Sequence, residues 1–162
     1  MEELLGSEYS EGCEDEAEFT LEELFALFPA GVYEFEGRTI EGNELDGEAI
    51  LSHVIPAPPE LVSPMEGDVL DPDLPVVIMW EKVEEPILPD LGPVDIVGFH
   101  VVVDRELPEP LVVFTADLPA DAEEVTVPPE FLEPGAEYTF EVLQIDASGN
   151  QTIAEDSFET ED

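Results

Sequence analysis

The sequence predicts a mainly β protein: an antiparallel β-sandwich of about seven strands in residues 57–162, preceded by a short helix and a β-hairpin. Short segments that alternate apolar and polar side chains recur along the chain, separated by turns rich in Pro, Gly and Asp. The 16 prolines of the chain suit loops, whereas inside helices they would remove hydrogen bonds. We therefore expect strands joined by loops rather than a helical bundle.

The N-terminal part predicts a flexible segment followed by a helix. Residues 1–18 mix acids, Gly and Ser with few apolar side chains, which indicates a flexible acidic N-terminus. Thr20 and Glu23 then form a Ser/Thr-x-x-Glu capping box. An amphipathic stripe follows at helical spacing: Leu21, Leu24, Phe25 and Phe28. Pro29 and Gly31 end this short helix.

Two further segments predict a hairpin directly after the helix. Val32–Ile40 and Ala49–Ile55 read as antiparallel strands, with GNELDG between them as the tip. The helix and hairpin together occupy residues 19–55, and the proline-rich segment 56–59 forms a stiff boundary. Because a lone hairpin is not stable in water, it should pack on the helix, extend an edge of the sandwich or pair with another chain.

Seven strands are expected in residues 57–162. The first five are Leu61–Pro64, Val76–Trp80, Asp95–Val103, Leu111–Phe114 and Glu124–Val127. In the sixth, Tyr138, Phe140 and Val142 share one face at a period of two residues. The seventh, Thr152–Phe158, pairs with it as a hairpin across a turn that contains Ser148-Gly149-Asn150.

The run Phe131–Asn150, FLEPGAEYTFEVLQIDASGN, resembles the second half of a fibronectin type III domain. The resemblance covers residues 57–162 and implies that Leu132 and Tyr138 form a tyrosine corner and that Trp80 is the core tryptophan. It also implies a binding or spacer module and favours an extracellular location. Gln144 departs from the pattern, since the family usually places a small apolar residue there. A buried amide at Gln144 would need hydrogen-bond partners.

The charge of the chain limits its partners. Forty-three acidic residues face three basic ones, Arg38, Lys82 and Arg105, which gives a formal net charge of -40. Nucleic acids and anionic membranes need cationic contacts and are therefore excluded, whereas cations and basic proteins are allowed. Adaptation to high salt and engineered negative supercharging both explain such a surface. We expect the stability to rise with ionic strength or divalent cations.

The sequence offers little for catalysis. Cys13 is the single cysteine, which leaves no intrachain disulfide, and both histidines, His53 and His100, fall in strand patterns. Motifs for a nucleophile elbow, a phosphate loop or a dinucleotide site do not occur. We therefore expect a protein that is not an enzyme. Neither a signal peptide nor a transmembrane run is recognisable, so we expect a soluble protein that is either cytoplasmic or part of a longer exported chain.

One loop predicts a metal site. Asp68, Asp71 and Asp73 lie close together in EGDVLDPDLP, and closely spaced oxygen ligands on a loop suit calcium, although the spacing is not that of an EF-hand. The alternative is a solvated acidic loop.

The function expected from these observations is a non-enzymatic protein-interaction or structural module that binds through a sheet edge. The rival interpretation is a self-assembling, cation-dependent subunit whose hairpin pairs with a neighbouring chain. An engineered supercharged domain without a native function is a further alternative. An enzyme ranks behind these, because carboxylates alone do not define a site.

Overall fold

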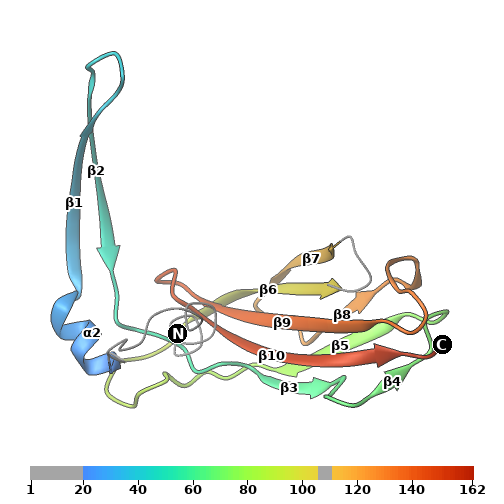
Figure 1. Ribbon diagram of the computed structural model, residues 1–162. Coiled ribbons are helices and arrows are strands. Elements are labelled where there is room, and N and C mark those ends of the chain that lie inside the picture. Colours follow the sequence, from blue (N-terminus) through green and yellow to red (C-terminus); the bar gives the residue numbers. More distant parts are fainter. Residues whose placement is uncertain (1–19, 106–110) are drawn as a thin grey trace, which may run out of the picture. The chain divides into compact units, whose positions relative to one another are not determined.

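The computed structural model describes residues 20–105 and 111–162 of the chain (Figure 1). The chain divides into two compact units, residues 1–53 and residues 54–162. We call the described part of the first, residues 20–53, the helix–hairpin unit, and the second the sandwich unit. The predicted flexible segment 1–18 and Cys13 lie outside the described residues.

The helix α2 (Leu21–Leu27) begins at the predicted capping box. The Thr20 hydroxyl accepts a hydrogen bond from the Glu23 backbone N–H at 3.2 Å, and the Glu23 carboxylate accepts one from the Thr20 backbone N–H at 2.9 Å. The backbone hydrogen bond from Thr20 is the main reason why the pKa of Glu23 lies below its usual value. The capping-box prediction is confirmed, and the helix ends at Phe28.

The hairpin consists of β1 (Gly31–Arg38) and β2 (Glu44–Leu51). The predicted second strand, Ala49–Ile55, was wrong at both ends. The turn is closed around Thr39, whose backbone N–H donates to the Asn43 carbonyl at 2.9 Å and whose hydroxyl accepts from the Asn43 N–H at 3.1 Å. Because this turn is tight, residues 44–48 pair with β1 instead of forming the tip.

Two sheets form the sandwich unit (Figure 1). One has the order β3-β5-β8, with β3 (Glu60–Ser63), β5 (Val76–Glu81) and β8 (Glu124–Val127). The other has the order β4-β10-β9-β6-β7, with β4 (Val69–Leu70), β10 (Gln151–Thr160), β9 (Glu137–Asp146), β6 (Ile96–Arg105) and β7 (Val112–Pro119). A 3-10 turn, η1 (Pro129–Phe131), precedes β9.

The structure confirms the mainly β sandwich and adds one strand to the seven expected. The extra strand, β4, pairs in parallel with the end of β10, while the other strand pairs are antiparallel. Its two residues lie between turn-forming residues, so they are too few to produce a visible alternation. The fourth predicted strand ended too early, because β7 continues to Pro119.

Side chains from both sheets fill the core. Trp80 of β5 packs on Phe99 of β6 at a ring distance of 5.3 Å, and Tyr138 of β9 stacks on Phe158 of β10 at 5.1 Å. These four rings are at most 2% exposed. Ile55, two residues before the predicted start of the sandwich, is also buried, and its carbonyl accepts a hydrogen bond from Ile87.

The described helix α2 is short, and none of the helices in residues 20–105 and 111–162 has the length and apolar character needed to cross a membrane.

Candidate interaction surface

The two faces of the hairpin differ in chemistry. Side chains alternate between faces along each strand, and the register places Tyr33 opposite Ala49 and Phe35 opposite Gly47. The face that contains them has no charged residue. Its side chains, which we call the apolar face, are those of Tyr33, Phe35, Leu45, Ala49 and Leu51.

The apolar face is largely uncovered. Phe35 and Leu45 are 59% and 56% exposed to solvent. Tyr33 is half-buried, and its hydroxyl donates a hydrogen bond to the Pro29 carbonyl at 2.9 Å. None of the residues 20–53 is buried, so the helix–hairpin unit has no core of its own among its described residues.

The centre of the opposite face of the hairpin is acidic. Glu34 lies directly opposite Glu48, and Glu36 lies directly opposite Asp46, while the exposed apolar pair Val32 and Ile50 lies at one end of this face. We call the four acidic side chains the acidic face. Like charges in directly opposed positions destabilise a strand pair. At the turn end of the same face, Arg38 and Glu44 form an ion pair of 3.2 Å. Their side chains are 73% and 79% exposed, so this ion pair stabilises the hairpin little.

His53 links the helix to the hairpin. Its ring stacks on Phe25 with a centroid distance of 3.9 Å, and its Nε2 lies 2.7 Å from the Phe28 carbonyl oxygen, which requires a proton on Nε2. The prediction that His53 is a strand residue was wrong, because β2 ends at Leu51. The sequence carried no signal for this contact, since 25 residues separate His53 from Phe28.

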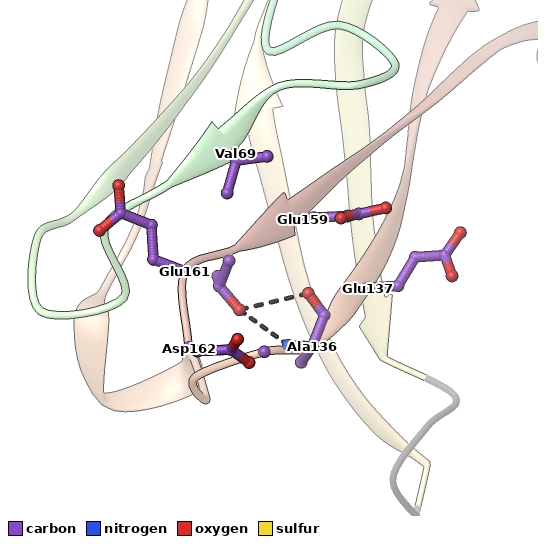
Figure 2. A pocket seen from close by; sticks show the side chains of 8 residues that line it. Val69, Ala136, Glu137, Glu159, Glu161 and Asp162 are labelled. Atoms are coloured by element: carbon purple, nitrogen blue, oxygen red, sulfur yellow. Dashed lines mark hydrogen bonds between the residues drawn. The ribbon is translucent and has the colours of Figure 1, made fainter.

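A second acidic region lies at the C-terminal end of β10, where the residues that line a pocket of about 420 Å³ include Glu137, Glu159, Glu161 and Asp162. Glu159 is directly opposite Glu137. Figure 2 shows the side chains of Glu137 and Glu159 extending to one side and that of Glu161 to the other. The Thr160 hydroxyl accepts a hydrogen bond from the Ala136 N–H and donates one to the Ala136 carbonyl. The carboxylates therefore do not converge on one point.

The predicted calcium ligands lie on either side of β4. The Asp68 carboxylate accepts a hydrogen bond from Met65 N–H, and the Asp71 carboxylate accepts one from Asp73 N–H, both at 2.9 Å. Among the described residues, no group of three or more His, Cys, Asp or Glu side chains is arranged to hold a metal ion. Asp68, Asp71 and Asp73 are thus not brought together, and calcium binding there stays a prediction without support from the geometry.

Gln144 is a structural residue of the sandwich unit. It is fully buried on β9, where its amide nitrogen donates to the carbonyls of Ala57 at 3.0 Å and Val83 at 2.7 Å, and its amide oxygen accepts from Val83 N–H at 3.1 Å. The expectation that a buried amide at this position needs partners is confirmed. Gln144 thus joins β9 to the segment before β3 and to the segment after β5.

Tyr138 forms the predicted corner. Its hydroxyl accepts a hydrogen bond from Glu133 N–H at 2.7 Å, and Leu132 is buried beside it in the core. Glu133 also pairs through its carboxylate with the buried Arg105 guanidinium. The hydrogen bond between the Arg105 guanidinium and the Glu133 carboxylate raises the pKa of Arg105 above its usual value. The pairing was not foreseen from the sequence.

Asp146 and His100 both have structural contacts. Burial would raise the pKa of Asp146, but hydrogen bonds from Ser148 and from the Asp95 N–H hold that pKa below its usual value. His100 lies on β6 as predicted, 2.7 Å from an Asp117 carboxylate oxygen on β7.

The sandwich unit is a mainly β fold of two sheets. Its similarity in fold extends to the third fibronectin III domain of the human KIAA0343 protein, with 15% identity, a TM-score of 0.43 and coverage of 69% of this chain and 85% of that one. The chicken CNTN1 FN1–FN3 domains align with 15% identity and a TM-score of 0.40 over 80% of this chain and 44% of theirs. A structure described as "Myokine structure" aligns with 20% identity and a TM-score of 0.45 over 66% of this chain and 99% of that one.

No protein-family model matches the chain, and the comparison with curated proteins gives no match.

Proposed function

We propose that this chain is a non-enzymatic protein-interaction module in which the sandwich unit is a stable base and the helix–hairpin unit contacts the partner. The observation that carries the proposal is the lack of any buried residue in residues 20–53, although the hairpin has a continuous apolar face.

Elementary energetics support a partner for the hairpin. A two-stranded hairpin is at best marginally stable in water, and a third strand or a packed layer is needed for independent stability. Covering exposed apolar surface contributes about 25 cal/mol per Å². On the apolar face, Phe35 and Leu45 are each more than half exposed, so a covering layer would remove much of their surface from water.

The surroundings of the titratable residues support a non-enzymatic role. Each histidine has a structural contact, His53 with the Phe28 carbonyl and His100 with Asp117. At the pocket at the end of β10, the Glu161 side chain extends away from those of Glu137 and Glu159 (Figure 2). General acid–base catalysis needs positioned groups that converge on a substrate atom.

Paired variants test the proposal. A partner is first identified by cross-linking from the hairpin and then purified. The chain with Phe35→Ser and Leu45→Ser should lose binding to this partner. The matched control removes two apolar side chains of similar exposure from the sandwich unit, Leu74→Ser and Val113→Ser, which are 58% and 48% exposed in the wild type. Equal binding by both variants would refute the role of the hairpin.

The rival function is self-assembly that depends on cations. Light scattering with and without millimolar calcium separates the two functions. An oligomer that forms only with calcium and is lost on Phe35→Ser and Leu45→Ser substitution would establish the rival. A monomer under both conditions would support binding to a different protein.

A further inference from the structure

We infer that the segment of the partner that binds the hairpin is an extended strand alternating apolar and basic residues, which adds to the hairpin as a third strand. This inference rests on the proposed function and names the chemistry of the partner. It follows from the two faces of the hairpin, from the charges of the whole chain and from the small area of the apolar face.

The two faces set the alternation of the incoming strand. A strand added to an edge of β1 or β2 places successive side chains on the two faces in turn. One set lies beside the apolar face, next to side chains such as Phe35 and Leu45. The other set lies beside the acidic face, within reach of the opposed pair Glu34 and Glu48. Apolar residues suit the first set and basic residues suit the second.

The positive charge has to come from another molecule. The sequence contains three basic residues, and each already has an acidic partner. Arg38 pairs with Glu44 at 3.2 Å, Lys82 pairs with Glu84 at 2.8 Å, and Arg105 pairs with Glu133. A second copy of the chain would bring the same three engaged bases and a further formal charge of -40. Self-association therefore leaves the acidic face uncompensated.

The apolar face is also too small to hold two copies together. Each strand of the hairpin has eight residues. At a rise of about 3.3 Å per residue and a strand spacing of about 4.8 Å, the face covers roughly 250 Å². A standard protein interface buries about 800 Å² per partner. Strand addition engages both faces and the backbone of one edge at the same time, so it uses the hairpin more fully.

Free cations would satisfy only half of the hairpin. Metal ions or polyamines can neutralise the acidic face, but they leave Phe35 and Leu45 in water. A strand with Lys or Arg at every second position compensates the charges of the acidic face and covers the apolar face together. It also completes the three strands that a small sheet needs for stability.

The test is a titration of the full chain, labelled with nitrogen-15, with an eight-residue peptide that alternates Lys and Val. We expect saturable chemical-shift changes within residues 31–51. A peptide of the same composition with four Lys followed by four Val should bind at least about tenfold more weakly, because it cannot match the two faces. A peptide alternating Glu and Val should not bind.

Two variants locate the charge effect. Glu34→Gln with Glu48→Gln should weaken binding of the Lys-Val peptide by about threefold to tenfold. The matched control, Glu60→Gln with Glu81→Gln, removes an equally charged and directly opposed pair from β3 and β5 of the sandwich unit. It should keep wild-type affinity. Equal weakening in both variants would overturn the inference, since attraction by the net charge alone would then explain binding.

The outcomes separate this inference from the proposed function. A neutral peptide alternating Thr and Val that binds residues 31–51 as tightly as the Lys-Val peptide would overturn the basic partner and leave the hairpin as the binding element. Shifts spread over the sandwich unit, or no saturable shifts in residues 31–51, would overturn strand addition. The proposed function itself fails only if the Phe35→Ser and Leu45→Ser variant keeps its purified partner.

Discussion

The same short motif occurs in both units with opposite outcomes. Tyr33-x-Phe35 lies on β1 and Tyr138-x-Phe140 lies on β9, each with its two rings on one face. Tyr138 and Phe140 are fully buried, whereas Phe35 is 59% exposed. The difference is a second layer: β5 and its neighbours contribute to the core that covers β9, and the described residues of the helix–hairpin unit supply no such core. An alternating pattern therefore identifies a face that needs cover, not the layer that covers it.

The largest test of this contrast is truncation of the two phenylalanines. Phe140→Ala should lower the free energy of unfolding by about 3–5 kcal/mol, because it leaves a cavity in a closed core. Phe35→Ala should change it by less than about 0.5 kcal/mol, because the ring already faces solvent. Denaturant unfolding followed by far-ultraviolet circular dichroism, which reports on the strands of both units, measures both. Equal losses would mean that Phe35 is as well covered as Phe140.

The next effect concerns the buried amide. Gln144→Leu should cost about 2–3 kcal/mol, since it leaves the carbonyls of Ala57 and Val83 and the Val83 N–H without their partner. Gln151→Leu makes the same chemical change at an exposed position of β10 and should be nearly neutral. Thermal unfolding compares the two variants. A neutral Gln144→Leu would show that the amide is not needed to hold these segments.

The hydroxyls of Tyr138 and Tyr33 offer a smaller and closely matched comparison. Tyr138→Phe should cost about 1–2 kcal/mol, because the Glu133 N–H loses its acceptor inside the protein. Tyr33→Phe removes a bond to the Pro29 carbonyl, which water can replace at the surface, and should cost less than about 0.5 kcal/mol. The shift of the urea unfolding midpoint measures the loss of stability in each variant. A larger loss in Tyr33→Phe than in Tyr138→Phe would contradict the structural role of the corner.

The response to acid should come next in size. The pKa of Asp146 is lowered in the folded protein, so its carboxylate contributes stability above its unfolded pKa of about 3.9, and this contribution is lost as the pH falls through the folded pKa. Asp146→Asn should therefore be less stable than the wild type by about 1 kcal/mol at pH 7, with a gap that closes below about pH 4. Unfolding at pH 3 to 7 in high salt measures the gap. A gap that widens toward acid would contradict the assigned direction.

The smallest expected difference concerns calcium. Raising the salt concentration should raise the melting temperature, because it screens the net charge of -40. At equal ionic strength, Asp71→Asn should respond to calcium as the wild type does, because the Asp71 carboxylate already caps Asp73 N–H. Calorimetric titration provides the measurement. Saturable one-site binding lost in Asp71→Asn would instead establish the loop site.

Local patterns predicted much of the fold. The capping box at Thr20 and the inward alternation of Val76, Ile78 and Trp80 depend on residues close in sequence. The corner at Tyr138 was predicted through the resemblance to fibronectin type III domains. Features that join distant residues were missed or only partly foreseen. His53 contacts Phe28, and Gln144 bonds to Ala57 across 87 residues, contacts for which no local period exists.

The candidate interaction surface was foreseen in outline only. The sequence predicted a hairpin that needs a partner, but the second strand was placed too late in the chain. The residues that share each face of the hairpin could therefore not all be predicted. Once residues 44–48 pair with β1, Leu45 joins Phe35 on one face and Asp46 and Glu48 join Glu34 and Glu36 on the other.

By itself the sequence determined the charge, the alternation of each strand and the need of Gln144 for partners, because these depend on side-chain chemistry and on the period of the backbone. Only the tertiary structure decided which apolar faces are covered. Coverage depends on a second layer built from residues far apart in the chain. The core around Tyr138 has such a layer, whereas Phe35 on the hairpin remains exposed.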